Sequence, residues 1–65
     1  MLTPQEQVTL EALIDRHTLG GVLDAVAEIC YAKGEHVMQT WHDEPLMRTW
    51  MLVGERLADV RTEDL

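Results

Sequence analysis

Apolar residues recur at intervals of three and four through most of this 65-residue chain, a spacing typical of amphipathic helices. The first such segment contains Leu10, Leu13 and Ile14. Thr3 is a suitable N-cap, Pro4 fits the first helical position, and Glu6 stands where a capping box places its carboxylate. The pattern predicts a helix over about residues 4–16.

The second segment has the widest apolar face. In the break "RHTLGG", Thr18 can cap a new helix, although a continuous helix bent at this point is an alternative. The pattern predicts a helix over about residues 19–41. Its apolar arc consists of Leu19, Leu23, Val26, Cys30, Val37 and Trp41.

The third segment follows the break "WHDEP", where Asp43 can cap a helix and Pro45 is tolerated in a first turn. We predict this helix over about residues 44–61 and a frayed tail over residues 62–65. Its inner stripe contains Trp50, Val53, Leu57 and Val60.

The short link between the second and third helices predicts an antiparallel hairpin. Counting outward from the turn places Gly34 near Val53 and Gly54, so that two interior glycines lie at about the same level. Each glycine costs about 1 kcal/mol relative to alanine. They indicate either a close contact between the helices or a groove left open for a partner.

The chain is long enough for one all-α domain, spanning residues 1–65. A chain of this size buries only about 60 % of the surface of its unfolded form, and its one cysteine excludes an internal disulfide. The apolar arcs are wider than one neighbouring helix can fill, even with the first helix as a further cover. We therefore expect a homodimer that forms a helical bundle, with the two inner stripes as core or dimer interface.

The charge indicates what kind of partner to expect. Twelve acidic residues against five basic ones give a net charge of -7, which disfavours direct binding to nucleic acid. An acidic stripe runs along the outer face of the second helix: Asp24, Glu28, Tyr31 and Glu35. It is either a solvated face or a docking face for a protein with a basic surface, with Tyr31 as an aromatic anchor.

The same composition bears on the compartment. Hydrophobic residues make up 46 % of the chain, too many for a disordered protein, yet no apolar run reaches the roughly 18 residues that a membrane span needs. The start lacks the basic and apolar regions of a signal peptide. Together with a single free thiol, these features predict a cytoplasmic protein.

The residues capable of catalysis do not form a recognisable site. Cys30 lies in the middle of the apolar arc, where a free cysteine behaves as a small hydrophobe. A dimer could combine His36 and His42 of two chains, but the spacings typical of zinc and di-iron sites are absent. We expect no enzyme activity, no metal and no cofactor.

Two segments, "LIDRHTLGGVLDAVAEICYAKGEHV" and "TWHDEPLMRTWMLVGERLADV", resemble a group of short, uncharacterised all-helical proteins encoded by bacteria, phages or plasmids. The likeness covers about residues 11–60 and implies an architecture but no reaction. The chain departs from the pattern at Gly34 and Pro45. The matching positions are Glu28, Ile29, Cys30, Lys33, Glu35, His36, Trp41, Asp43, Glu44 and Trp50.

A weaker likeness, of architecture alone, is to the plasmid protein Rop, a dimer of helical hairpins that binds paired RNA loops. The basic face that such binding needs is missing here. The sequence thus favours a small acidic protein-binding regulator, inhibitor or adaptor that acts as a homodimer. The alternatives are a nucleic-acid-binding regulator of the Rop type and a structural subunit of a larger assembly.

Overall fold

The computed structural model describes residues 1–63, and their secondary structure is entirely helical. Helix α1 spans Pro4–His17, α2 spans Leu19–Trp41 and α3 spans Glu44–Ala58. The predicted all-α fold is confirmed for these residues, and all three helices begin where the sequence places them. The break at Thr18 separates two helices, so the alternative of one continuous bent helix does not apply.

Side-chain caps explain where the helices begin. The N–H of Thr3 donates to Oε1 of Glu6 over 2.9 Å, and the N–H of Glu6 donates to Oγ1 of Thr3 over 3.1 Å. Oγ1 of Thr18 accepts a bond of 3.0 Å from the N–H three residues later, and Oδ1 of Asp43 accepts an equivalent bond of 3.1 Å. Each cap satisfies an amide that has no partner within its own helix.

Helix α3 ends at Ala58, earlier than the predicted residue 61. The amide of Asp59 is shared between the carbonyls four and three residues earlier, at 3.1 and 3.3 Å, and the amide of Val60 bonds to the carbonyl of Leu57 at 3.3 Å. The last turn thus tightens to three-residue spacing, a common helix ending. Val60 consequently lies beyond the helix. Of the predicted frayed tail, residues 64–65 lie outside the described residues.

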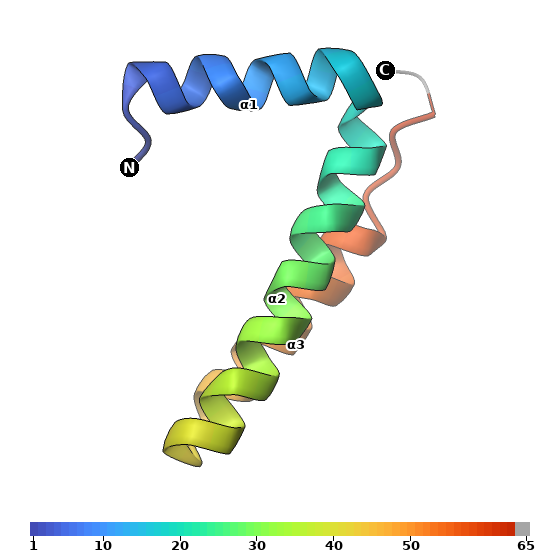
Figure 1. Ribbon diagram of the computed structural model, residues 1–65. Coiled ribbons are helices and arrows are strands. Elements are labelled where there is room, and N and C mark those ends of the chain that lie inside the picture. Colours follow the sequence, from blue (N-terminus) through green and yellow to red (C-terminus); the bar gives the residue numbers. More distant parts are fainter. Residues whose placement is uncertain (64–65) are drawn as a thin grey trace.

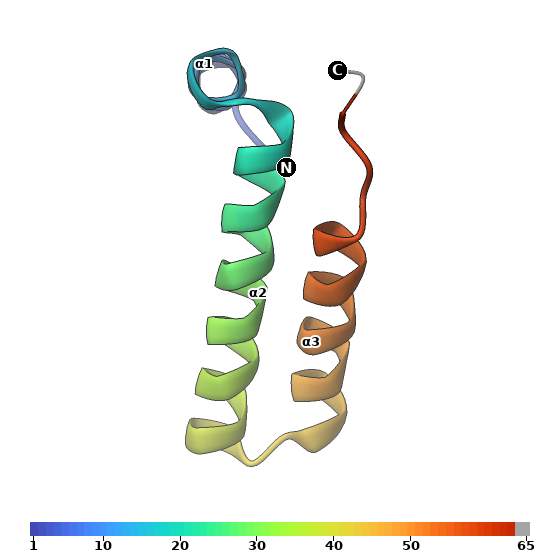
Figure 2. The same ribbon diagram turned by 90° about the vertical axis from the view of Figure 1, so that its right-hand side faces the viewer.

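Helices α2 and α3 lie side by side as an antiparallel hairpin (Figures 1 and 2). Gly34 and Gly54 are both buried in their contact. A methyl group added at Gly34 would lie 2.9 Å from Cε of Met51, and one at Gly54 would lie 2.6 Å from Cε1 of Tyr31. The glycines therefore permit a close helix–helix contact, and the alternative of an open groove at these positions is wrong.

The register of the hairpin differs from the prediction by about one helical turn. Gly34 faces Met47, Trp50 and Met51, not the predicted Val53 and Gly54. Gly54 in turn faces Ala27 and Tyr31. The two glycines are therefore staggered, and each one accommodates a larger side chain from the other helix.

Helix α1 does not cover the hairpin. It runs across the end of α2, and Figure 2 shows it end-on, projecting from one face of the hairpin. Contrary to the prediction, α1 contributes no buried residue. The change of direction occurs at Thr18, whose φ of 140° and ψ of 157° are unusual for a residue with a side chain.

The hydrophobic core is small. Among the described residues, the buried apolar side chains are Ala27, Cys30 and Val37. The radius of gyration is 13.7 Å, whereas a compact domain of this length has about 11 Å. The chain is thus an open L-shaped molecule, with much apolar surface left outside.

Candidate protein-interaction surfaces

The acidic stripe is exposed in its charged part. Asp24, Glu28 and Glu35 lie in a narrow arc of α2, and all three side chains are exposed. Tyr31 lies within the same arc but is half-buried, because its ring packs on Gly54. The structure thus gives Tyr31 a packing role inside the hairpin that the sequence analysis missed. In the sequence, the glycine at position 54 is the feature that could have indicated this contact.

Carboxylates of α3 extend this acidic surface. Glu44 and Glu55 are eleven residues apart, which places them on one face of α3. Helical geometry directs this face to the same side of the hairpin as the acidic stripe. Glu44 forms an ion pair with Arg48 one turn later. The carboxylates of the two long helices therefore concentrate on one side.

The predicted core or interface residues fall into three groups. Cys30 and Val37 are buried. Four more are half-buried: Leu19, Leu23, Trp50 and Leu57. Four are exposed: Val26 at 37 %, Trp41 at 72 %, Val53 at 42 % and Val60 at 49 %. These four exposed residues are not part of the core of the isolated chain. For them, only the predicted role in a dimer interface stays a prediction.

Four exposed apolar residues of the hairpin gather on the side opposite the carboxylates, whereas Met38, Trp41 and Leu52 are exposed outside this group. On α2, Val26 and Ile29 flank the contact with α3 on the side away from the acidic stripe. On α3, Leu46 and Val53 flank the contact on the side away from Glu55. Because the helices are antiparallel, these residues share one face, which we call the apolar face (Val26, Ile29, Leu46 and Val53).

An apolar groove lies in the corner where α1 leaves this face. It is open to solvent and has a volume of about 530 Å³. The walls are formed mainly by Leu10, Leu13 and His17 of α1 and by Val22, Val26 and Ile29 of α2. The apolar pattern of the sequence does not predict this groove. Two features of the sequence could have indicated it. Leu10 and Leu13 form an apolar stripe on the first helix, and Val22 and Ile29 widen the apolar arc of the second helix.

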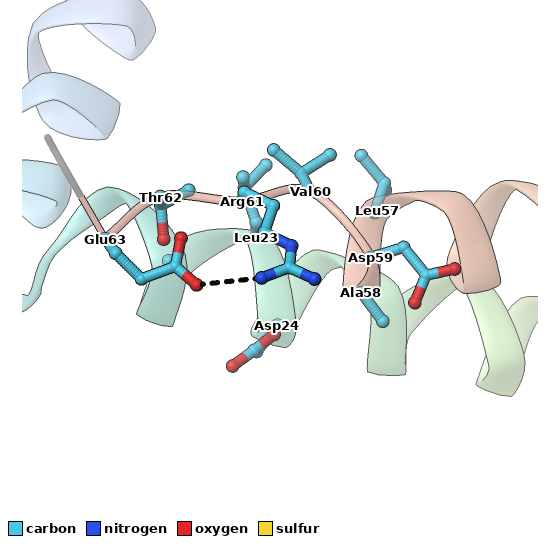
Figure 3. Close-up of a pocket in the computed structure, with 10 residues that line it drawn as sticks. Leu23, Asp24, Leu57, Ala58, Asp59, Val60, Arg61, Thr62 and Glu63 are labelled. Atoms are coloured by element: carbon cyan, nitrogen blue, oxygen red, sulfur yellow. Dashed lines mark ion pairs between the residues drawn. The ribbon is translucent and has the colours of Figure 1, made fainter.

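A second hollow, of about 440 Å³, lies where the segment after α3 runs back past the start of α2 (Figure 3). The approach is close: a methyl group at Gly20 would lie 2.5 Å from Oγ1 of Thr62. In Figure 3, Arg61 points toward Glu63, and their charged groups are 3.6 Å apart. Asp24 also lines the hollow, but its carboxylate points away from this pair. Among the described residues, the acidic side chains of this hollow do not form a group of three or more that could hold a metal.

The described residues offer no grouping that suits a metal. Within residues 1–63, His, Cys, Asp and Glu side chains do not cluster in threes or more. Cys30 is a buried free thiol. His42 caps the end of α2 in the left-handed conformation, at φ 52°, and its N–H donates to the carbonyl of Met38 over 3.1 Å. None of the helices in this part of the chain combines the length and apolarity that crossing a membrane requires.

The surfaces that stand out are therefore the acidic side of the hairpin, the apolar face and the apolar groove. The resemblances to short bacterial, phage or plasmid proteins and to Rop stay predictions from the sequence. No family model matches the chain, and no curated protein or solved structure is detectably similar to it.

Proposed function

We propose that this chain is a small acidic protein-binding module, a regulator, inhibitor or adaptor without catalytic activity, which acts as a homodimer. One observation carries the proposal: the carboxylates of the hairpin and the four residues of the apolar face lie on opposite sides of it. The apolar face suits association with another copy. The acidic side remains outside such a dimer and is free to meet a partner.

The partner class follows from the charge. Asp24, Glu28 and Glu35 are exposed on one arc of α2, in a chain with a net charge of -7. A surface of one sign attracts a partner of the opposite sign and repels polyanions such as nucleic acid. We therefore propose a basic protein surface as the target, such as one that itself binds nucleic acid. A cytoplasmic location fits the single free thiol, since thiols stay reduced there.

The proposal is tested by charge reversal on two helices. The double variant Glu28→Lys/Glu35→Lys changes the acidic stripe. The matched control Glu11→Lys/Asp15→Lys makes the same change in net charge on α1, where both side chains are exposed. Proteins captured by the wild-type chain from nuclease-treated cell extract are identified and purified, and their affinities for all three forms are then measured.

We expect the stripe variant to lose affinity and the control to retain it. Binding should also weaken as salt is raised, because exposed charges are screened. Equal affinity of the stripe variant and the wild type would overturn the acidic docking face. Salt-sensitive binding of RNA or DNA by the purified protein would favour a nucleic-acid-binding regulator of the Rop type instead.

A further inference from the structure

We infer that the apolar groove between α1 and α2, together with the apolar face of the hairpin, is the docking site for a second copy of this chain. This inference rests on the homodimer proposed above and specifies its interface. It adds α1 to the interface, so that the hairpins alone do not make the dimer.

The first argument is the amount of exposed surface. The chain exposes 5505 Å², whereas a folded monomer of 7.4 kDa exposes about 4,200 Å². The excess is roughly 1,300 Å² per chain. Stable homodimers bury about 1,000 Å² or more per subunit, so one symmetric contact between two copies accounts for the excess.

The second argument is the location of the exposed apolar side chains. Ile29 is 56 % exposed and Leu13 is 44 % exposed, and both line the groove. Val53 and Leu46, at 42 % and 44 % exposed, lie on the same side of the hairpin on α3. Exposed apolar residues scattered singly are ordinary, whereas several that share one side of a molecule favour an interface.

The distribution of charge also favours a contact between two copies on this side. Two chains of net charge -7 repel each other unless their contact excludes the carboxylates. On the hairpin, Glu28, Glu35 and Glu55 lie on the side away from the groove, by helical spacing. Lys33 is the charged residue that spacing places on the apolar side of α2. A second copy of this chain can therefore approach this side of the hairpin with little repulsion; on α1, Glu6 is the carboxylate that spacing places on the arc of Leu10 and Leu13.

The shape of the chain also suits a contact between two copies. Helix α1 projects from one face of the hairpin (Figure 2). Val26 and Ile29 of the apolar face line the groove beside α1, so they lie on that side. The surface thus offers a concave corner together with a projecting apolar arm. In a pair related by a two-fold axis, the same surface contacts itself. The α1 of each copy then covers part of the apolar face of the other, and the apolar residues of each corner are buried.

The test is sedimentation equilibrium on full-length variants that each add one carboxylate. Ile29→Glu and Leu13→Glu place it in the groove, and Gln39→Glu places it on exposed α2 surface outside the groove. Because Ile29 and Leu13 are exposed in the single chain, the substitutions should leave its helices intact, which circular dichroism checks. We expect both groove variants to raise the dimer dissociation constant at least about a hundredfold, since each two-fold interface would bury two unpaired carboxylates. The control should dimerise like the wild type.

A second measurement uses the wild-type sequence, so that folding of a variant is not in question. A sample is mixed from ¹³C-labelled and unlabelled chains, and isotope-filtered nuclear Overhauser contacts then report only pairs of methyl groups from different copies. We expect contacts from Leu10 and Leu13 to Val26, Ile29 or Val53.

The possible failures are distinguishable. A wild-type chain that is monomeric in both measurements overturns the homodimer and this interface together. A dimer that tolerates Ile29→Glu and Leu13→Glu, or whose methyl contacts lie elsewhere, overturns this interface and leaves the proposed homodimer standing. Neither measurement involves the basic protein proposed for the acidic side. A failure to find that protein therefore affects the acidic docking face and not this dimer interface.

Discussion

The aromatic ring of Tyr31 on α2 lies against Gly54 on α3, so closely that a methyl group on the glycine would come within 2.6 Å of Cε1 and 3.0 Å of Cδ1. The backbone carbonyl oxygen of Ala27 would lie 3.1 Å away. The contact joins a rigid ring, a backbone and a residue without a side chain. It makes Gly54 less tolerant of an added methyl group than Gly34, whose nearest neighbour is the flexible end of a methionine.

We predict that Gly54→Ala lowers the free energy of unfolding by up to about 2 kcal/mol. Overpacking costs about 1–3 kcal/mol, and the higher helix propensity of alanine returns about 1 kcal/mol. Urea unfolding at a fixed protein concentration measures the change. In a Tyr31→Ala background the same substitution should cost less, because the ring has gone. Equal costs in both backgrounds would show that Tyr31 and Gly54 are not coupled.

Gly34→Ala should be tolerated better than Gly54→Ala. Its nearest neighbour is Cε of Met51, at 2.9 Å from the added methyl group, and the carbonyl oxygen of Met47 lies at 3.3 Å. A methionine side chain is flexible and can move its end away. We expect a change within about 1 kcal/mol of the wild type, since helix propensity offsets the crowding. If Gly34→Ala unfolds at lower urea concentration than Gly54→Ala, the described contacts are wrong.

The starts of the helices were predictable because they depend on residues close in the sequence. The register of the hairpin was not, because it depends on contacts between residues far apart in the sequence. Thr3 with Glu6, Thr18 and Asp43 all act within three residues of the amide that they cap, so the sequence alone reveals them. The register of the hairpin depends instead on how the turn at His42 is made, and on which side chain each glycine accommodates. Counting from the turn misses both, and the predicted pairs were displaced by about one turn.

The orientation of α1 escaped prediction for a related reason. It depends on the backbone of Thr18, with φ at 140°, and no propensity favours a β-branched residue there. The groove and the exposed state of Val26 and Val53 follow from that orientation. Spacing thus indicated which apolar residues share an arc of α2 or α3, but neither the pairs that they form nor which of them stay exposed in the single chain.

The backbone at Thr18 leads to a prediction that runs against helix propensity. Thr18→Ala loses the cap to the N–H of Gly21 and keeps the unfavourable φ. Thr18→Gly also loses the cap but adopts this φ without steric cost. We expect the glycine variant to be more stable than the alanine variant by about 1 kcal/mol or more, as measured by thermal unfolding at equal concentrations. The reverse order would mean that α1 does not leave α2 through this conformation.

The capping box of α1 should depend on pH, because it includes the carboxylate of Glu6. The hydrogen bond from the backbone N–H of Thr3, followed by that involving its side chain, holds the pKa of Glu6 below the ordinary value of 4.5. The folded form therefore favours the carboxylate, and its contribution to α1 is complete above pH 4.5 and is lost as the pH falls through the lowered pKa.

Amide exchange at Thr3 and the helical chemical shifts of α1 measure this loss. The variant Glu6→Gln can make the same capping bond without titrating, so it isolates Glu6 from the other carboxylates. We expect the wild-type signals to change as the pH falls below 4.5, and those of Glu6→Gln to change less. Identical acid profiles would contradict the reciprocal bond between Thr3 and Glu6.

The central claim is that the apolar surface left open by this L-shaped chain is completed by a second copy. Native mass spectrometry of the untagged protein, over a range of micromolar concentrations, tests it most directly. We predict a species with the mass of two 7.4 kDa chains, which gains population as the concentration rises. A single species of 7.4 kDa at every concentration would contradict the claim, because the apolar face and the groove would then be open in the protein as it exists in solution.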